Sequence, residues 1–125
     1  MKYFLVILCL FIIGCNSLPE YKFVKEYSQL NYSFSELYKI NTNEYDESEF
    51  PSGMRLEISG FINGKGMLYI IQPPDQKVWA LTFKLEGEIM EKIDRTDWYR
   101  PECIINFVPD NEFVTGNILI KLRIY

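Results

Sequence analysis

The chain has 125 residues, with 13 basic against 17 acidic side chains and no histidine. A formal net charge of −4 disfavours nucleic acid and anionic lipid as partners, because clusters of basic residues bind both. Without histidine, the chain cannot build a Ser-His-Asp or Cys-His centre or a histidine metal site. This length predicts one domain that can bury a core without metals or disulfides.

The first seventeen residues have the layout of a secretory signal. Lys2 is followed by an unbroken apolar run over residues 3–13, and Gly14 closes the run before Cys15. Eleven apolar residues make roughly 16 Å of helix, against a hydrocarbon core of about 30 Å. The segment is therefore expected to be a cleaved signal helix and not a membrane anchor. Plain secretion, with Cys15 as a free thiol, stays open.

The segment Ile12-Ile13-Gly14-Cys15 resembles the lipobox of bacterial lipoproteins, with Ile12 where Leu is commonest. The resemblance implies removal of residues 1–14, attachment of lipid to the Cys15 thiol, and acylation of the new amino terminus, for example with palmitate. Residues 15–20 then form a lipidated tether at the extracytoplasmic side of a bacterial membrane. Two or more acyl chains make such an attachment stable. By the family's sorting rule, Asn16 favours the outer membrane in a Gram-negative cell.

Residues 21–40 are rich in aromatic side chains. Tyr21 and Phe23 alternate at period two, as do Tyr32 and Phe34, and this spacing predicts half-buried strands. Residues 33–38 could also begin a short helix. Residues 41–53 are acidic and full of turn formers, and they are expected to form a long loop.

The β pattern is stronger from Met54 onwards. Apolar and polar residues alternate over 54–59, and Asn63-Gly64 is a typical hairpin turn before a strand over 67–72. Residues 73–77 contain two prolines and predict another turn. A strand over 78–85 follows, in which Trp79 is expected to be part of the core.

The remaining residues continue the pattern. Residues 89–93 are ambiguous, 94–101 predict a loop, and 103–108 and 118–125 predict strands. Six to eight short strands at about ten-residue spacing favour an all-β fold, a single antiparallel β-sandwich over residues 21–125. No amphipathic helix is long enough for an α/β unit.

Residues 66–79 and 116–122 loosely resemble small extracytoplasmic β-sandwich modules. In those modules one strand carries a Pro-Asp-Gly-Lys-like turn and the last strand begins at a glycine. Here Gln76 stands in place of the turn glycine. The resemblance implies an architecture and no particular function, because such folds host many functions.

Trp98, Tyr99 and Arg100 are the candidate ligand- or partner-binding residues. Trp, Tyr and Arg dominate binding hot spots, since they bury much area and still form hydrogen bonds. Two adjacent large aromatics beside an arginine in a predicted loop therefore indicate a possible binding surface. The alternative is that Trp98 plugs the core while Tyr99 covers a sheet edge.

Other candidate sites have simpler interpretations. Cys103 shares a predicted face with Ile105 and Phe107, which favours a small buried side chain over a nucleophile. Carboxylate pairs such as those of a glycosidase occur at Glu86/Glu88 and Asp94/Asp97, where solvated acids beside turns are the expected reading. The acidic loop could bind calcium through its carboxylates but lacks the spacing of a calcium loop. These acids are Glu44, Asp46, Glu47 and Glu49.

We expect no cofactor, no metal and no catalysis.

Residues 51–56 and 64–66 resemble the Ser-Gly-x-Arg-Tyr and Lys-Gly segments of membrane-bound lysozyme inhibitors, which are also lipoproteins. Ser52, Arg55 and Lys65 are the matching positions. Leu56 stands where tyrosine is usual, and the paired cysteines of that family are missing.

The sequence thus predicts a membrane-anchored extracytoplasmic lipoprotein that acts as a non-catalytic binding module for an envelope protein or glycan. One alternative is an inhibitor or immunity-type lipoprotein against an exported hydrolase such as lysozyme. The other is a structural subunit of an envelope complex.

Overall fold

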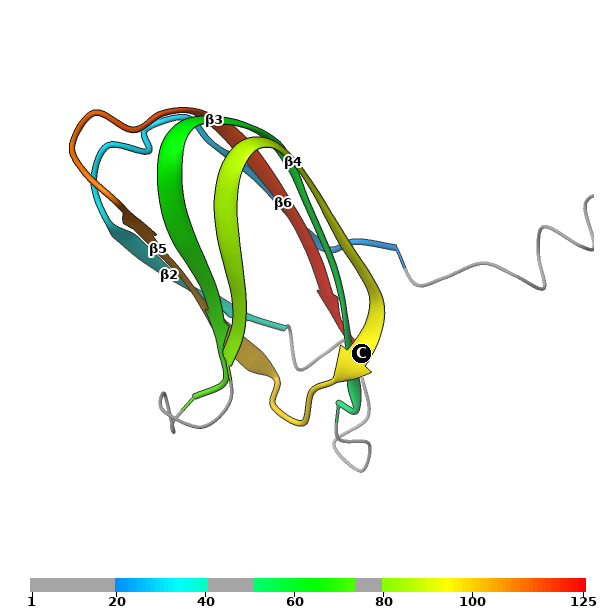
Figure 1. Cartoon of the computed structure of the whole chain (residues 1–125). Coiled ribbons are helices and arrows are strands. Elements are labelled where there is room, and N and C mark those ends of the chain that lie inside the picture. The colour runs from blue at the N-terminus through cyan, green and yellow to red at the C-terminus, as the bar shows by residue number, and fades with distance from the viewer. Residues whose placement is uncertain (1–19, 41–50, 74–79) are drawn as a thin grey trace, which may run out of the picture.

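The computed structural model describes residues 20–40, 51–73 and 80–125, which form six strands and no helix (Figure 1). None of the described segments is a helix long and apolar enough to cross a membrane. The expectations for the leader and Cys15, for residues 41–50 of the acidic loop and for Trp79 lie outside the described residues. The strands are β1 (Phe23–Tyr27), β2 (Phe34–Lys39), β3 (Gly53–Ile71), β4 (Ala80–Asp97), β5 (Glu102–Pro109) and β6 (Thr115–Ile124).

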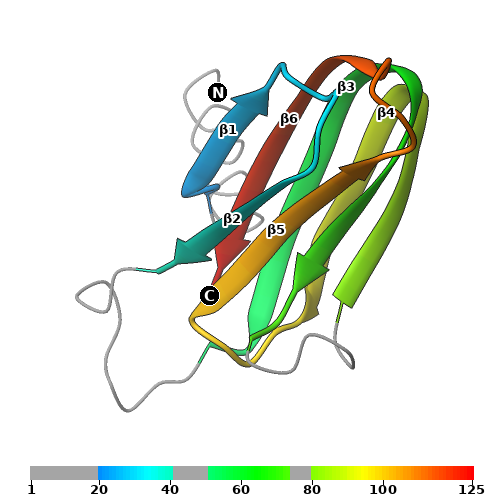
Figure 2. The same cartoon turned by 90° about the vertical axis from the view of Figure 1, so that its left-hand side faces the viewer.

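The six strands form one antiparallel sheet that curls into two facing layers. Its order is β1-β6-β3-β5-β2, and β4 pairs with β3. The first half of β3 pairs with β6 and the second half with β5. The β1 layer therefore contains β1, β6, residues 53–62 of β3 and residues 87–97 of β4. The β2 layer contains β2, β5, residues 66–71 of β3 and residues 80–86 of β4. Figure 2 shows β2 and β5 in front of β1 and β6.

Strands β3 and β4 bend together where they cross from one layer to the other, and Figure 1 shows both arching over the same end of the molecule. The pairing shifts between Ile62 and Lys65, and Gly64 and Gly87 take φ values of 106° and 66° there. Glycine adopts such positive φ at little steric cost. The connections β1–β2 and β5–β6 cross between the layers at this end too. The fold is thus a stack of four arches.

The apolar faces of both layers meet in the middle and form the core. Twenty hydrophobic side chains are buried among the described residues, and Phe107 is the largest that is fully buried. Its ring lies over Gly66, where an added Cβ would be 2.5 Å from two ring carbons. A glycine at position 66 therefore makes room for Phe107 beneath the bend.

The expected antiparallel all-β class is confirmed, but several boundaries differ. The predicted hairpin turn at Asn63-Gly64 is wrong, because β3 continues through it and is 19 residues long. The predicted loop over 94–101 is wrong for residues 94–97, which belong to the 18-residue β4. The open choice for residues 33–38 is resolved as a strand, β2. Pairing of each half of β3 with a different distant strand explains why one strand spans both layers.

Strand β4 forms one end of the stack, and within the described ranges only β3 pairs with it. Glu91 lies opposite the buried Ile58, so a carboxylate occupies the inward side of this edge. A bulge follows, because two residues of β4 stand opposite Arg55 alone. Inward charges and bulges are devices that keep a free edge from pairing with another strand.

Candidate functional site

An apolar strip lies on the outer surface of the β2 layer. Antiparallel partners share a face, and the register pairs Leu37 with Ile104 and Met67 with Val108. Leu37 is 60% exposed and Val108 is 43% exposed, although both are aliphatic. Met67, Tyr69 and Ile104 are half-buried, and Asn106 lies on the same face between Ile104 and Val108. Exposed apolar side chains that gather on a sheet are typical of a contact surface. The strip consists of Leu37, Met67, Tyr69, Ile104 and Val108.

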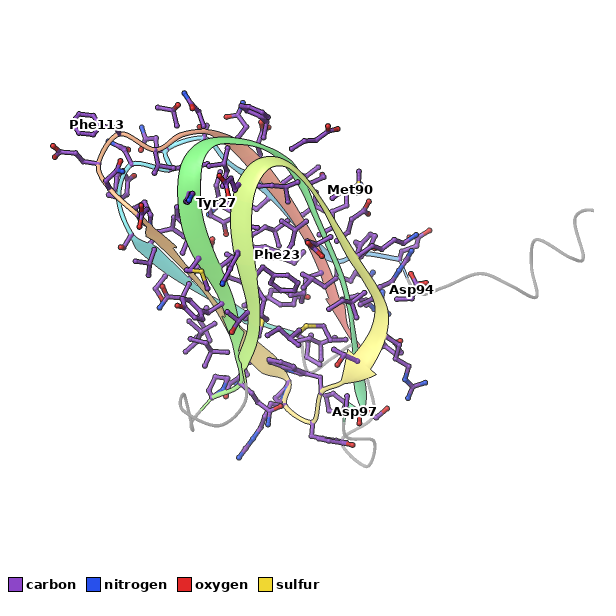
Figure 3. The ribbon with its side chains drawn as sticks, in the orientation of Figure 1. Phe23, Tyr27, Met90, Asp94, Asp97 and Phe113 are labelled. Carbon is purple, nitrogen blue, oxygen red and sulfur yellow. The ribbon has the colours of Figure 1, made fainter. Side chains whose placement is uncertain are left out.

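The corresponding outer face of the β1 layer has a different character. Its central rows place Arg55 opposite Arg123 and Glu57 opposite Lys121. Apolar side chains also occur on this face: Phe61 is 57% exposed and Met90 is 70% exposed. Met90 and Leu119 flank Ser59, one row from Phe61, and Figure 3 shows Met90 pointing outward from β4. The outer face of the β1 layer therefore combines charged rows with apolar side chains.

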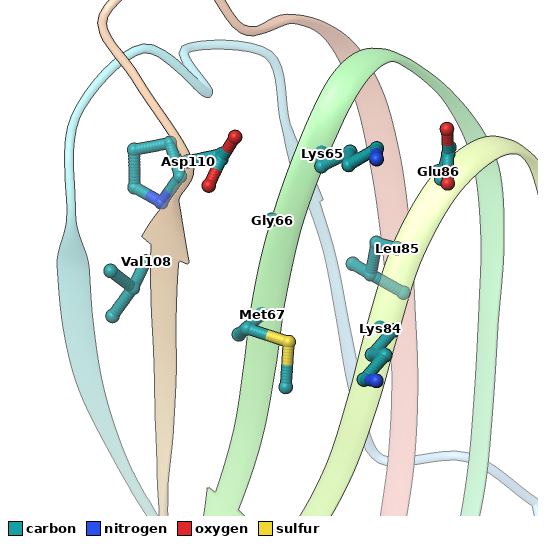
Figure 4. Close-up of a pocket in the computed structure, with 9 residues that line it drawn as sticks. Lys65, Gly66, Met67, Lys84, Leu85, Glu86, Val108 and Asp110 are labelled. Carbon is teal, nitrogen blue, oxygen red and sulfur yellow. The ribbon is translucent and has the colours of Figure 1, made fainter.

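A groove of about 520 Å³ lies at the bend, at one end of the apolar strip (Figure 4). Met67 and Val108 supply apolar lining, and Lys65, Lys84, Glu86 and Asp110 supply charges of both signs. The backbone holds its rim together, because the Asp110 amide donates a hydrogen bond of 2.9 Å to the Lys65 carbonyl. A site with both signs suits a partner that itself carries mixed charges, as a folded protein does.

The β1–β2 arch forms the other end of the stack and is joined by side chains. The ring centroids of Phe23 and Tyr38 are 5.1 Å apart, and those of Tyr27 and Phe34 are 4.4 Å apart and nearly parallel. Figure 3 shows Phe23 between the two layers. Lys25 lies 2.7 Å from Glu36 between these ring pairs. The aromatic side chains thus fill the space between β1 and β2.

Glu36 is the centre of a small polar cluster in this arch. The Lys25 ammonium donates to both carboxylate oxygens, at 2.7 and 3.0 Å, and the Tyr27 hydroxyl donates to one of them. Burial works to raise the pKa of Glu36, but the hydrogen bonds from Lys25 and Tyr27 and the charge of Lys25 outweigh it and lower that pKa. The pKa of the Tyr27 hydroxyl is raised by burial and by its bond to Glu36. Glu36 is therefore held as a carboxylate.

An end hollow of about 450 Å³ opens beside this cluster. Lys25, Tyr27, Phe34 and Glu36 contribute to its wall from the strands, and Gln29 and Tyr32 from the connection between them. The Tyr32 ring is 52% exposed, and its hydroxyl donates a 2.6 Å hydrogen bond to Gln29 Oε1. The hollow combines a fixed aromatic ring with several polar groups.

The three residues predicted to bind a ligand or partner lie in different surroundings. Trp98 is 3% exposed and belongs to the core, and its indole Nε1 donates a 3.1 Å hydrogen bond to the Glu102 carbonyl. Tyr99 is 61% exposed, and Arg100 is also exposed. Trp98 therefore closes the core at the end opposite the bends of the arches. Of the three residues, only Tyr99 and Arg100 are accessible. Their role in binding stays a prediction.

The other sequence candidates have structural roles or lie apart. Cys103 is fully buried, as predicted, and burial raises the pKa of its thiol to about 12. The side chains of Glu86, Glu88, Asp94 and Asp97 are all exposed on β4. Among the described residues, no group of three acidic, cysteine or histidine side chains could hold a metal ion.

The positions that match lysozyme inhibitors do not form one site. Ser52 precedes β3 and donates its amide to the Tyr125 carbonyl at 2.9 Å. Arg55 lies on the outer face of the β1 layer, 4.3 Å from the Tyr21 ring centroid. Lys65 lies beyond the bend, in the groove of the β2 layer. One strand thus carries Arg55 and Lys65 into different layers.

Sequence reasoning missed the end hollow, although the sequence contains a signal for it. Phe23, Lys25 and Tyr27 have the spacing aromatic-x-cation-x-aromatic, and Phe34, Glu36 and Tyr38 repeat it with an anion. The two segments thus carry opposite charges, each flanked by aromatic rings at the same spacing. This complementarity indicates two strands whose side chains face each other. The apolar strip gave no such signal, because its residues come from three strands.

A scan against protein-family models and a search of curated proteins find no match to the chain.

Proposed function

We propose that this protein is a lipid-anchored binding module that holds an envelope protein at the extracytoplasmic side of a bacterial membrane. The observation that carries the binding part is the apolar strip on the outer face of the β2 layer. Leu37 and Val108 expose aliphatic surface in adjacent strands of that face. Burying such surface against a partner is favourable by about 25 cal/mol for each Å².

The chemistry around the strip favours a folded protein as the partner. The groove at its end places Lys65 and Lys84 near Glu86 and Asp110, so neither sign of charge dominates. A polyanionic glycan or an anionic lipid surface would need a basic patch there. An apolar centre with a polar rim of both signs is the usual anatomy of a protein–protein interface.

The anchor part of the proposal is supported by the lipobox-type residues that end at Cys15. Five peptide steps separate Cys15 from Glu20, which is at most about 17 Å of extended chain. Glu20 is attached to the domain, because the Arg123 guanidinium donates a 3.1 Å hydrogen bond to its carbonyl. Such a tether would keep the domain close to the membrane surface, where an envelope partner is also confined.

Mass spectrometry of the protein purified from its own membranes tests the anchor. The expected mature chain begins at Cys15 and carries a diacylglyceryl group on the thiol and an acyl chain on the amino terminus. The Cys15→Ser variant should no longer be found in the membrane fraction. A mature chain that begins elsewhere, or a serine variant that stays on membranes, would refute the anchor and leave the binding part standing.

Cross-linking and affinity capture from the native envelope test the binding part. Leu37→Asp and Val108→Asp should each weaken capture of the partner about tenfold or more, because each places a charge in the apolar centre. Val24→Asp is the matched control, since Val24 is 56% exposed on the outer face of the β1 layer. Equal capture by all three variants, or capture only of a second copy of this chain, contradicts the proposal.

A further inference from the structure

We infer that the end hollow at the β1–β2 arch binds a neutral pyranose unit of a polysaccharide. The site is separate from the apolar strip, so it does not depend on the proposed protein partner. Its volume, about 450 Å³, lies within the range of about 300–1,000 Å³ that is usual for small-molecule sites. The argument for a sugar comes from the aromatic and polar groups that line it.

The aromatic part of the hollow is accessible and rigid. Tyr32 exposes half of its side chain, and the bond from its hydroxyl to Gln29 restrains the ring. Tyr27 and Phe34 stack at 4.4 Å with an angle of 10° between their planes, so they present fixed ring edges beside it. The C–H face of a pyranose packs on an aromatic ring. A ring held in place before binding loses little conformational entropy when the ligand arrives.

The polar part of the hollow has a compensated ion pair at its centre, and Glu26 adds one further negative charge to the lining, so no positive charge is left to favour an acidic sugar. The charges of Lys25 and Glu36 compensate one another across 2.7 Å. Glu36 keeps acceptor capacity, because an ionised carboxylate accepts about four hydrogen bonds and the described contacts supply three. Gln29 uses its carbonyl oxygen for Tyr32, which leaves its amide donors for a ligand. Acceptors and donors around a compensated pair suit hydroxyl groups, which both donate and accept.

Saturation-transfer difference NMR tests this inference with the full chain in detergent micelles. The probes are tetrasaccharides of β-1,4-linked N-acetylglucosamine, β-1,4-linked glucose and α-1,4-linked glucose, each at millimolar concentration. At least one probe should receive saturation at its ring protons. Tyr32→Ala should reduce that signal about tenfold or more, whereas Phe61→Ala should leave it unchanged. Phe61 is the matched control because it is an aromatic residue of similar exposure, 57%, and does not line the hollow.

A second variant keeps the test independent of folding defects. Tyr32→Phe retains the ring and loses only the hydroxyl that bonds Gln29, so binding should weaken severalfold and persist. No saturation transfer to any of the three probes overturns the inference. Equal signals from the native chain and Tyr32→Ala, or a preference for an acidic tetrasaccharide or a peptide over the neutral probes, overturn it as well. None of these outcomes bears on capture of a protein by the apolar strip.

Discussion

Lys25 Nζ lies 2.7 Å from Glu36 Oε1, and this ion pair joins two strands that belong to different layers of the sheet. The pair lies between two aromatic contacts, Phe23 with Tyr38 and Tyr27 with Phe34. Side chains therefore provide the connection here that backbone hydrogen bonds provide within each layer.

Glu36 should make the stability of the protein depend on acid. Its pKa is lower in the folded chain than in the unfolded chain, so the carboxylate stabilises the fold above its unfolded pKa. That contribution is lost as the pH falls from about 4.5 through the lower folded pKa. Urea unfolding near neutral pH should show Glu36→Gln less stable than the native chain, and the difference should shrink near pH 3. Glu26→Gln is the control, because Glu26 is an exposed carboxylate on β1, next to Lys25 in the sequence.

A difference between Glu36→Gln and the native chain that stays constant from neutral pH to pH 3 would contradict the acid dependence. The same series should show little change in Glu26→Gln, because isolated surface charges contribute less than about 1 kcal/mol.

Gly66→Ala should destabilise the fold by about 1–3 kcal/mol, because the new Cβ would press on the Phe107 ring. Urea denaturation measures the loss. The double variant Gly66→Ala/Phe107→Leu tests the cause, since the smaller side chain removes the clash. It should be more stable than the sum of the two single changes predicts. Strict additivity would show that the ring contact is not what position 66 accommodates.

Trp98 and Tyr99 should respond very differently to truncation. Trp98→Ala removes a buried ring and its bond to the Glu102 carbonyl, and it should cost about 3–5 kcal/mol. Tyr99→Ala changes an exposed side chain and should stay within about 0.5 kcal/mol of the native chain. Thermal and urea unfolding of both variants provide the comparison. A small effect of Trp98→Ala would mean that the indole does not close the core.

Cys103 should resist alkylation while the protein is folded. Its side chain is fully buried, and burial raises the pKa of the thiol to about 12, so little thiolate forms near neutral pH. Peptide mapping after treatment with iodoacetamide should find label at position 103 only when denaturant is present. Cys103→Ala should be tolerated better than Cys103→Ser, which buries a hydroxyl at a cost of about 1–3 kcal/mol if it finds no partner. Rapid labelling of the folded chain would contradict the burial.

Local patterns in the sequence predicted much of the sheet. The period-two spacing of Ile118, Ile120 and Leu122, with Lys121 and Arg123 on the other face, predicts the buried face of β6. All three apolar side chains are fully buried. Cys103 was likewise placed on the buried face by its spacing from Ile105. Period-two alternation works here because each strand has one face in the core and one towards solvent.

Long-range pairing explains what the sequence could not predict. Asn63-Gly64 favours a hairpin turn locally, yet β6 pairs with the residues before it and β5 with those after it, so the strand bends and continues. The end hollow depends on which segments face each other across an arch. The burial of Trp98 could not be predicted either. An aromatic residue beside a loop can be buried at the end of the core or exposed in a contact surface.

The inward charges at the two ends of the stack have a consequence for association between copies of this chain, which the proposed lipid anchor would bring close together. The outer strand of an arch has backbone groups that could pair with an arch of a second copy, and repeated pairing of this kind would build a fibril. Glu91 at one end and the Lys25–Glu36 pair at the other would each have to be buried in such a fibril. That desolvation penalty opposes head-to-tail polymerisation.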